Sequence, residues 1–403
     1  MMRERGTSMN PPRTLGVGLI SVGWMGRLHS RAYLAAGQHY PDLPVRASLA
    51  VAADPDEGGR AHARDALGYR RTVADYRELL ADPEVDVVSI CSPNFLHREI
   101  ALAAVAAGKP FWIEKPMGRS AEESREISVA ATAAGLVTSV GFNYRHAPAV
   151  AEIRRLVRAG ALGRITNVRV SLLADYSADP RSALTWRFLK DRAGSGVVGD
   201  LLSHGLDLAQ FVVGRIDSVS ALTETFIPSR PLPAAGAVNR FSSDTDATRT
   251  GAVENEDYVS VLARFDGGAV GVLESSRVAI GPRSEYVLEV YGTKGSVRWD
   301  FQRLNELQFA DDPAGYRTIM ASPGFGDFAR FQPGAGTSMG FDDLKTVEAA
   351  LFLRSVAEGR QLGPSAADGW AAAEAADAAL RSAASGTWTA VPTVDGETTY
   401  DRP

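Results

Sequence analysis

An aspartate and a histidine stand four residues apart, at Asp200 and His204, after a glycine-rich run in the middle of the chain. This spacing places two side chains on one face of a helix, which we expect over residues 200–212. Histidine is the usual base for removing a hydroxyl proton near neutral pH, and Asp200 could orient it or bind a substrate hydroxyl. An aspartate that caps the helix, followed by a buried histidine with satisfied hydrogen bonds, explains the spacing equally well.

A lysine at the end of an apolar run, Lys115, stands between Glu114 and Pro116. A second polar cluster, residues 91–97, follows another apolar run. Ligands of open α/β sheets bind outside the carboxyl ends of the strands, so both clusters are candidates for ligand contacts. The Lys115 ammonium could hold a hydroxyl oxygen, stabilise a developing alkoxide or reach a nicotinamide ribose. For His97, a capping or surface role and a cofactor contact fit the sequence equally well.

A glycine-rich motif occurs at residues 18–26, where a predicted strand passes into a predicted helix. This is the context of a dinucleotide-binding fingerprint. Gly23 would let the backbone approach a pyrophosphate, Gly26 would let helix and strand pack closely, and the helix N-terminus would offer N–H groups to the phosphates. Ser21 replaces the first glycine of the fingerprint. A packing turn that binds nothing remains the alternative.

An acidic residue, Asp54, ends the second predicted strand. Its carboxylate can accept hydrogen bonds from ribose hydroxyls and would repel a 2′-phosphate, which favours NAD over NADP. The interval from the glycine motif is longer than usual, and residues 37–46 are the stretch that lengthens it. Asp54 could equally well cap the helix that follows.

Two patterns of elements position these residues. Up to residue 140, short apolar runs alternate with helical patterns, as in a parallel sheet built from βαβ units. The expected strands are residues 15–20, 49–53, 87–91, 110–113 and 137–140. From residue 216 strands follow one another without helices, and Asp266-Gly267 predicts a hairpin turn. The fold class is therefore α/β, a Rossmann-type doubly wound parallel sheet followed by an α+β domain with a large, open, predominantly antiparallel sheet.

Length and composition predict the number of domains and exclude some classes of function. A chain of 403 residues predicts two domains, which we place at residues 13–143 and 144–403 after a disordered tail at 1–12. The net charge of −5 gives no reason to expect nucleic acid as a partner, and no apolar stretch approaches the roughly 20 residues of a membrane span. The single cysteine fits a reducing compartment, so we expect the cytoplasm. One Asp–His pair is insufficient for a metal site. Residues 228–256, rich in Pro, Ser, Thr and Gly, predict either a functional loop or partial disorder.

Taken together, these motifs resemble the Gfo/Idh/MocA family of oxidoreductases, the relatives of glucose–fructose oxidoreductase and inositol dehydrogenase. The resemblance runs from about residue 15 to 392. Its most specific parts are Glu114-Lys115-Pro116 and the glycine-rich run into Asp200 and His204, and residues 141–145 and 292–296 also match.

The resemblance implies an NAD-dependent dehydrogenase, with NADP less favoured, that acts on a sugar, sugar derivative or cyclitol and forms a homo-oligomer, a dimer or tetramer. The catalytic residues it implies are Lys115, Asp200 and His204. The expected cofactor-binding residues are Ser21, Gly23, Trp24, Met25, Gly26, Asp54, Ser92, Pro93, Asn94, His97, Glu114, Lys115 and Arg187. The expected substrate-binding residues are Lys115, Tyr144, Tyr176, Trp186, Asp200 and His204. An NAD-retaining lyase or glycoside-cleaving enzyme that oxidises its substrate transiently, and a non-catalytic sugar or nucleotide sensor, remain alternatives.

Overall fold

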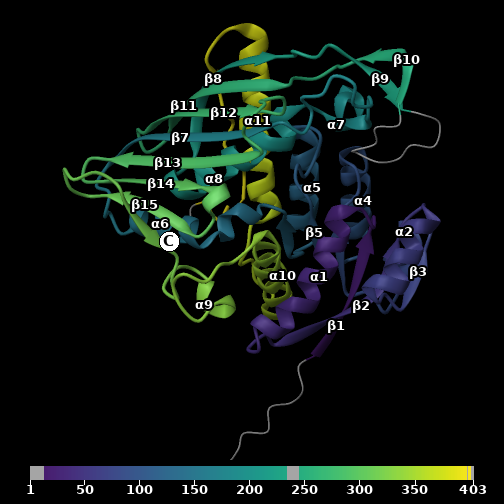
Figure 1. Ribbon diagram of the computed structural model, residues 1–403. Helices are drawn as coiled ribbons and strands as arrows, with labels where there is room; N and C mark the ends of the chain where they lie inside the picture. The colour runs from purple at the N-terminus through teal and green to yellow at the C-terminus, as the bar shows by residue number, and fades with distance from the viewer. Residues whose placement is uncertain (1–12, 234–244, 397, 401–403) are drawn as a thin grey trace, which may run out of the picture.

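A computed structural model describes residues 13–233, 245–396 and 398–400, and two sheets dominate it (Figure 1). The predicted tail at residues 1–12 lies outside the described part. The first sheet consists of β1 (Arg13–Ile20), β2 (Val45–Ala53), β3 (Arg71–Val73), β4 (Val87–Ile90), β5 (Phe111–Ile113) and β6 (Thr138–Val140). Its strands are parallel and lie in the order β3-β2-β1-β4-β5-β6, the doubly wound order of Rossmann folds. The predicted parallel sheet is confirmed.

The helices of this first part follow its strands. They are α1 (Trp24–His39), α2 (Glu57–His62), α3 (Tyr76–Ala81), α4 (Asn94–Ala106) and α5 (Ala121–Ala133). Local signals fix their ends. The Ser120 hydroxyl caps α5 by accepting from the Glu123 N–H, and Gly135 turns the chain just after it with a φ of 63°.

The second sheet has nine strands in the order β16-β15-β14-β13-β7-β12-β11-β8-β17. They are β7 (Ile165–Ala174), β8 (Ile216–Glu224), β11 (Tyr258–Phe265), β12 (Val270–Ser276), β13 (Ser284–Gly292), β14 (Ser296–Asp300), β15 (Glu306–Ala310), β16 (Arg317–Met320) and β17 (Thr389–Ala390). Only β7 and β12 pair in parallel, so the predicted, predominantly antiparallel sheet is confirmed. The turn between β11 and β12 is the expected hairpin, with Gly268 at a φ of 83°.

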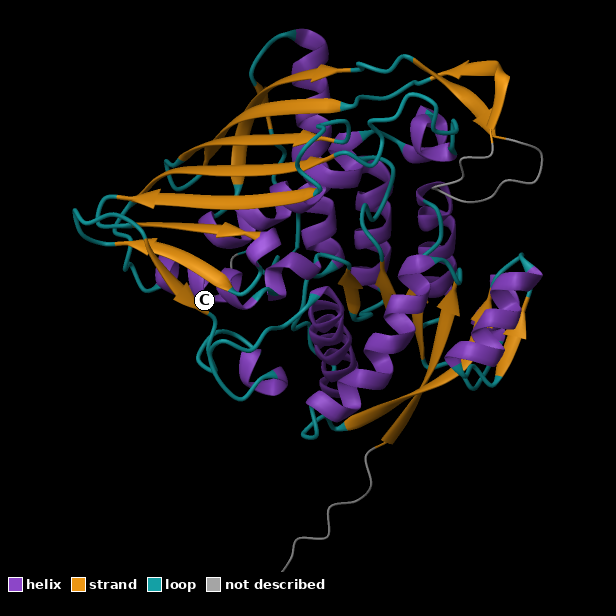
Figure 2. Cartoon of the chain, in the orientation of Figure 1, coloured by secondary structure: helices purple, strands orange, loops and turns teal. Residues whose placement is uncertain are grey.

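One face of the second sheet is covered by helices, as Figure 2 shows. These are α6 (Pro148–Arg158), α8 (Ser203–Val213) and α11 (Ala366–Ser385). Val219, Val261 and Leu273 point into this core and are buried. The alternate residues of the same strands face away from the helices, which leaves the opposite face of the sheet open.

For the segment 228–256 we expected either a functional loop or partial disorder, and its described residues correct the expectation of a loop. Its described residues contain β9 (Ser229–Pro233) and β10 (Thr245–Ala252), which pair as antiparallel strands. Residues 234–244, between the two strands, lie outside the described part.

The final helices return to the first sheet, which the sequence pattern does not indicate. Helix α10 (Phe341–Glu358) lies against α1 (Figure 1), and its Phe352 and Leu353 share a hydrophobic cluster with Leu15 and Val17 of β1. The start of α11 packs near β5 and β6 in the same way. The boundary at residues 143/144 therefore stays a prediction about the chain, while the core is shared across it.

Candidate active site

The glycine motif forms the turn between β1 and α1. Ser21, at the position of the missing glycine, adopts the left-handed conformation with a φ of 75°, which costs a non-glycine residue energy. Its N–H donates to the Ala53 carbonyl of β2 at 2.9 Å. A Cβ on Gly26 would lie 2.1 Å from the Ser21 carbonyl oxygen, so only glycine allows α1 to approach this closely.

The turn leaves room and donors for a phosphate group. A Cβ on Gly23 would meet nothing within 4 Å except Ser21 Oγ, at 4.0 Å, so protein packing does not require this glycine. Gly23 caps α1 without a side-chain hydrogen bond, and the first turn has no acidic residue. These features fit a dinucleotide pyrophosphate on the helix N-terminus. Trp24 beside it is 62% exposed and stacks on Phe341 of α10, at 5.9 Å between ring centroids. Met25 follows in the same turn.

Asp54 stands beside this turn, at the carboxyl end of β2. Its Oδ2 accepts from the Val22 N–H at 2.7 Å and its Oδ1 from the Asp56 N–H at 2.9 Å. Asp56, and not Asp54, caps α2, which corrects the capping alternative. The nearby Arg60 is engaged by Glu57 and by backbone carbonyls, so it does not neutralise the Asp54 carboxylate. The site therefore disfavours a 2′-phosphate.

The loop after β4 meets the loop after β5 through His97. This histidine is buried, and its Nδ1 and Nε2 lie 2.9 Å from the Pro116 carbonyl and 2.8 Å from the Ser92 carbonyl. The expectation of a surface or capping residue is corrected, and a cofactor contact through its ring nitrogens has no support. Ser92 Oγ is buried without a partner among the described residues. Pro93 caps α4, and Asn94 Nδ2 donates to the Ala193 carbonyl at 3.2 Å.

Glu114 faces inward. Its Oε1 lies 3.0 Å from His29 Nε2 and 2.6 Å from Lys345 Nζ of α10. Burial opposes its ionisation, but the Lys345 ammonium and the His29 hydrogen bond hold the pKa of Glu114 below its usual range. Burial raises the pKa of Glu348, the other acidic neighbour of Lys345, to about 8. Glu114 therefore belongs to a buried charge network, and its place in the expected cofactor-binding set has no support from its contacts.

Lys115 and Asp200 are brought together by two elements. The Lys115 Nζ donates to the Asp200 carbonyl at 2.6 Å and to its Oδ1 at 3.2 Å. The second carboxylate oxygen, Oδ2, accepts from the Tyr176 hydroxyl at 2.6 Å. Lys115 follows β5, Tyr176 follows β7, and Asp200 lies in a π-helical turn, Val198–Leu202, that runs directly into α8. These contacts show that Asp200 serves side chains of the site and does not cap α8.

His204 lies on α8 in an aromatic setting. Its ring meets that of Tyr144 edge-on, at 4.7 Å between centroids, and its Nδ1 is buried without a hydrogen-bond partner among the described residues. Burial, and then the Lys115 charge, lower the pKa of His204 well below its ordinary value. The imidazole is therefore neutral at pH 7 with an unused polar atom, which contradicts the alternative of a satisfied structural histidine.

A residue that the sequence did not single out, Glu256, holds the segment that carries Asp200. Its Oε1 accepts from the N–H groups of Gly196 at 2.8 Å and Val198 at 3.0 Å. A Cβ on Gly196 would lie 2.1 Å from the Glu256 carbonyl oxygen. This close approach explains why a glycine stands at this position of the glycine-rich run before Asp200. The only signal in the sequence was an acidic residue at the end of a segment rich in small residues.

The remaining predicted residues gather around the same loops. Trp186 meets Phe95 of α4 edge-on at 5.9 Å, and the Arg187 guanidinium lies 4.3 Å from the centroid of the Trp186 ring. The structure thus joins Trp186 and Arg187 to the start of α4, and Tyr144 and Tyr176 to the catalytic candidates. Among the described residues, no three His, Cys, Asp or Glu side chains are grouped as metal ligands would be.

Comparison with known proteins gives matches over both parts of the chain. Residues 15–142 match the oxidoreductase family with an NAD-binding Rossmann fold, and residues 150–298 match the GFO/IDH/MocA C-terminal domain. A levoglucosan dehydrogenase from Pseudarthrobacter phenanthrenivorans is 40% identical over 390 residues, 95% of this chain and 99% of that protein. The chain belongs to the Gfo/Idh/MocA family.

Two further comparisons agree with this family. A structure of levoglucosan dehydrogenase in complex with NADH and levoglucosan has a TM-score of 0.88 at 38% identity and covers 94% of this chain and 100% of that one. An inositol 2-dehydrogenase from Rhizobium meliloti is 26% identical over 92% of this chain and 97% of that protein. The protein is an NAD-binding oxidoreductase, and these dehydrogenases give no support to the lyase or sensor alternatives.

Proposed function

We propose that this Gfo/Idh/MocA protein oxidises a ring secondary alcohol of a sugar, sugar derivative or cyclitol to a ketone, with NAD as the oxidant. The observation that carries the proposal is the neutral imidazole of His204 beside the Lys115–Asp200 pair, whose buried Nδ1 has no hydrogen-bond partner in the part of the chain that the structure describes. A base and a cation at one place are what alcohol oxidation requires, because a proton leaves the oxygen while negative charge develops there.

Each side chain has a role that its contacts support. His204 accepts the hydroxyl proton. Lys115 holds the hydroxyl oxygen and stabilises its developing negative charge, while Asp200 keeps the ammonium in place and binds the same or a neighbouring hydroxyl. Tyr176 fixes the second oxygen of Asp200. NAD, when bound, supplies the acceptor to which the carbinol hydrogen is transferred as hydride. Lys115 and His204 could exchange the parts of base and oxygen ligand.

The substrate class follows from the polar and aromatic groups around this site. A polyhydroxylated ring needs several convergent hydrogen-bonding groups together with an aromatic face for its C–H side. Tyr144, Tyr176 and Trp186 can provide both. Relatives that act on levoglucosan and inositol agree with such a ring.

Two other features support the proposed cofactor and a cytoplasmic location. The uncompensated Asp54 carboxylate favours NAD over NADP, and the single cysteine fits the reducing cytoplasm. Among the described residues, no helix combines the length and the apolar character that a membrane span needs.

The test is turnover by wild-type protein and the His204→Asn variant. Nicotinamide absorbance is followed with NAD against inositols, aldoses, anhydrosugars and glycosides, and the ketone product is identified. His204→Asn should lower kcat by about 10²–10⁴-fold while NAD binding persists. His62→Asn makes the same change on α2, away from the candidate catalytic residues, and should leave turnover unchanged. Wild-type turnover of glycosides without net NADH would contradict the proposal, as would full activity of His204→Asn.

A further inference from the structure

A polar segment lies between β10 and β11 and consists of Glu254, Asn255, Glu256 and Asp257. The last three of these residues are buried. Buried polar side chains are as a rule hydrogen-bonded, so the partners of the polar segment show which parts of the chain it holds. Asp257 binds within its own sheet, because its Oδ1 accepts from the Arg277 Nε at 2.8 Å. The other three residues bind the chain beside the candidate active site.

The first half of the polar segment fastens the chain just after Trp186. The Asn255 Nδ2 donates to the Arg187 carbonyl at 2.8 Å, and the Glu254 Oε2 accepts from the Lys190 N–H at 2.8 Å. Trp186 contacts α4 of the first domain. These hydrogen bonds therefore fix the chain at the end of the site that meets the Rossmann fold.

Glu256 fastens the other end of the same stretch, where the π-helical turn that carries Asp200 begins. Its Oε1 accepts from the Gly196 N–H at 2.8 Å and from the Val198 N–H at 3.0 Å. Its main-chain carbonyl accepts from the Val197 N–H at 3.0 Å. Three successive N–H groups thus donate to one residue. The side chain of Glu256 provides two of these three hydrogen bonds, so it determines where the turn starts.

The position of this turn matters because Lys115 binds its backbone. The Lys115 Nζ donates to the main-chain carbonyl of Asp200 at 2.6 Å and to its Oδ1 at 3.2 Å. A displacement of the turn moves the main-chain oxygen that the ammonium contacts, and a rotation of the Asp200 side chain cannot restore that contact. In the proposed mechanism Lys115 holds the substrate oxygen, so the position of the turn determines where that oxygen is held.

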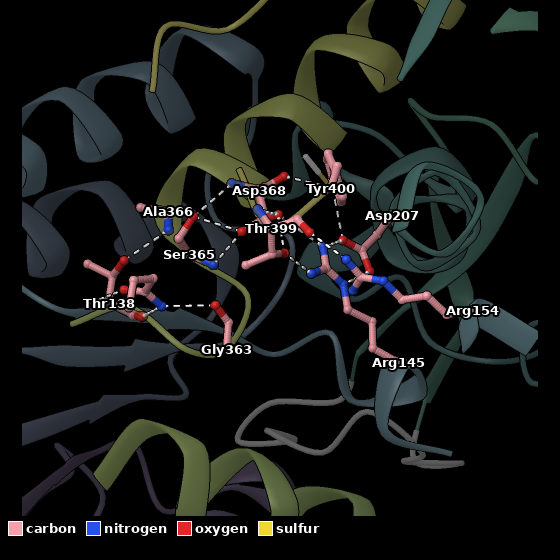
Figure 3. Close-up of polar contacts among 11 residues, drawn as sticks. Thr138, Arg145, Arg154, Asp207, Gly363, Ser365, Ala366, Asp368, Thr399 and Tyr400 are labelled. Atoms are coloured by element: carbon pink, nitrogen blue, oxygen red, sulfur yellow. Dashed lines mark hydrogen bonds and ion pairs between the residues drawn. The ribbon is translucent and has the colours of Figure 1, made fainter. Parts of the chain in front are cut away.

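Helix α8, which follows the turn, is held by a different set of contacts (Figure 3). Asp207 of α8 accepts from the Arg145 Nε at 2.8 Å and from the Tyr400 hydroxyl at 3.0 Å. Asp207 lies three residues after His204 on this helix. Loss of the Glu256 side chain should therefore loosen the turn while α8 and His204 stay in place.

We propose that Glu256 is a positioning residue of the candidate active site, which places Asp200 and, through it, the Lys115 ammonium. Its effect on turnover rests on the proposed function, whereas its hold on the turn does not. A misplacement of about 1 Å in an active site can cost about 10²-fold in rate. A residue that touches neither substrate nor cofactor can therefore have a large effect on kcat.

The kinetic experiment compares Glu256→Ala with Glu256→Gln. Alanine removes the acceptor of both N–H groups, whereas glutamine keeps a carbonyl oxygen that can accept them. The substrate is the inositol, aldose, anhydrosugar or glycoside that the wild type oxidises fastest. We expect Glu256→Ala to lower kcat by about 10–100-fold with the Kd of NAD unchanged, because the glycine turn and Asp54 are untouched. Glu256→Gln should stay close to the wild-type kcat.

Hydrogen exchange, read residue by residue, measures the hold on the turn without any substrate. In Glu256→Ala the N–H groups of Gly196 and Val198 should lose protection. The Val197 N–H should keep its protection, because it donates to the main-chain carbonyl of residue 256, which the substitution leaves in place. Glu256→Gln should protect all three N–H groups as the wild type does.

The matched control is Ser382→Ala on α11. The buried Ser382 hydroxyl accepts from the Ala221 N–H at 3.0 Å and donates to the Thr387 carbonyl at 2.6 Å. Its loss should lower stability and leave kcat unchanged at a temperature where both variants are folded. An equal fall of kcat in Ser382→Ala would show a general effect of lower stability and would overturn the proposal.

Other results would overturn the proposal as well. One is a wild-type kcat in Glu256→Ala, and another is unchanged exchange at Gly196 and Val198 in that variant. Unprotected N–H groups at these two positions in the wild type would overturn it without any variant. A wild type that oxidises no member of the panel would contradict the proposed function, and hydrogen exchange would still decide whether Glu256 holds the turn.

Discussion

Replacement of Lys345 by methionine tests whether the charge network behind Lys115 stabilises the protein. The Lys345 Nζ lies 2.6 Å from Glu114 and 2.8 Å from Glu348, and the three side chains are 1%, 9% and 0% exposed. Methionine keeps most of the apolar stem and removes the ammonium. Glu114 is then left with His29 as its remaining hydrogen-bond partner among these groups.

The size of the stability loss depends on whether Glu114 can take up a proton once Lys345 is removed. Loss of one partner of a buried ion pair typically costs about 3–5 kcal/mol. A stranded carboxyl can instead take up a proton. From the ordinary pKa of 4.5, protonation at pH 7 costs about 2.5 × 1.36, or roughly 3.4 kcal/mol. At pH 5 the same step costs about 0.7 kcal/mol. We therefore expect Lys345→Met to lose about 3 kcal/mol of stability at pH 7 and less than about 1 kcal/mol at pH 5.

The direction of the pH effect follows from the linkage between protonation of Glu114 and folding. In the wild type the pKa of Glu114 is held below its ordinary range, so its contribution to stability is complete above about pH 4.5. In Lys345→Met the same pKa is raised, so stability falls as pH rises above about 4.5. The deficit of the variant must therefore grow with pH.

Urea unfolding at pH 5 and pH 7 measures both quantities. Lys294→Met makes the same change at an exposed lysine and should be close to neutral. The double variant Lys345→Met/Glu114→Gln removes both charges and should recover most of the loss. A single variant within about 1 kcal/mol of wild type at pH 7 would refute the reasoning, as would a deficit that does not change with pH.

Three further predictions concern other parts of the molecule. Asp54→Asn should weaken NAD binding and bring the Kd values for NAD and NADP closer together; an unchanged ratio of the two constants would remove Asp54 from cofactor selection. Burial lowers the pKa of His29 to about 4, so the unfolded chain binds its proton first and stability should fall by up to about 3 kcal/mol between pH 6.5 and 4. Urea unfolding should show a flatter pH dependence in His29→Gln, and an equal dependence would count against this. Leu222, Leu262 and Val272 form an exposed apolar patch on the open sheet face, 60%, 52% and 40% exposed, and we propose that it joins subunits of a homo-oligomer. Light scattering should show a smaller species for Leu262→Lys, and an unaltered oligomer would exclude this face.

Much of the fold could be predicted from the local spacing of apolar residues. The elements that could not be predicted this way were missed for physical reasons. Five strands of the first sheet and the β11–β12 hairpin were predicted because apolar positions repeat along each of them. Strand β3 was not, because it has three residues, none of them buried. The return of α10 to β1 could not be predicted either, since an amphipathic helix shows that it has a partner without showing which one.

The same distinction between local patterns and distant contacts applies to the candidate site. Lys115, Asp200 and His204 could be identified because each follows a strand or shares a helix face with another chemical group. Contacts between distant segments could not. Nothing in the sequence couples Glu256 to the N–H groups before Asp200, or His97 to the carbonyl of Pro116. At Ser21 the local residue type departs from the fingerprint, but the structure does not. The backbone there has the positive φ that a glycine would favour, although the residue is a serine.

The Lys345–Glu114 contact gives the packing of α10 against the first sheet a consequence for the proposed reaction. A glutamate buried next to Lys115 would, if left unpaired, either protonate or draw the Lys115 ammonium inward. Lys345 of α10 supplies the compensating charge, so in the proposed mechanism Lys115 stays available to Asp200 and to a substrate oxygen. In the proposed mechanism the Glu-Lys-Pro motif therefore depends on Lys345, and we expect α10 to be packed before Lys115 can hold the substrate oxygen.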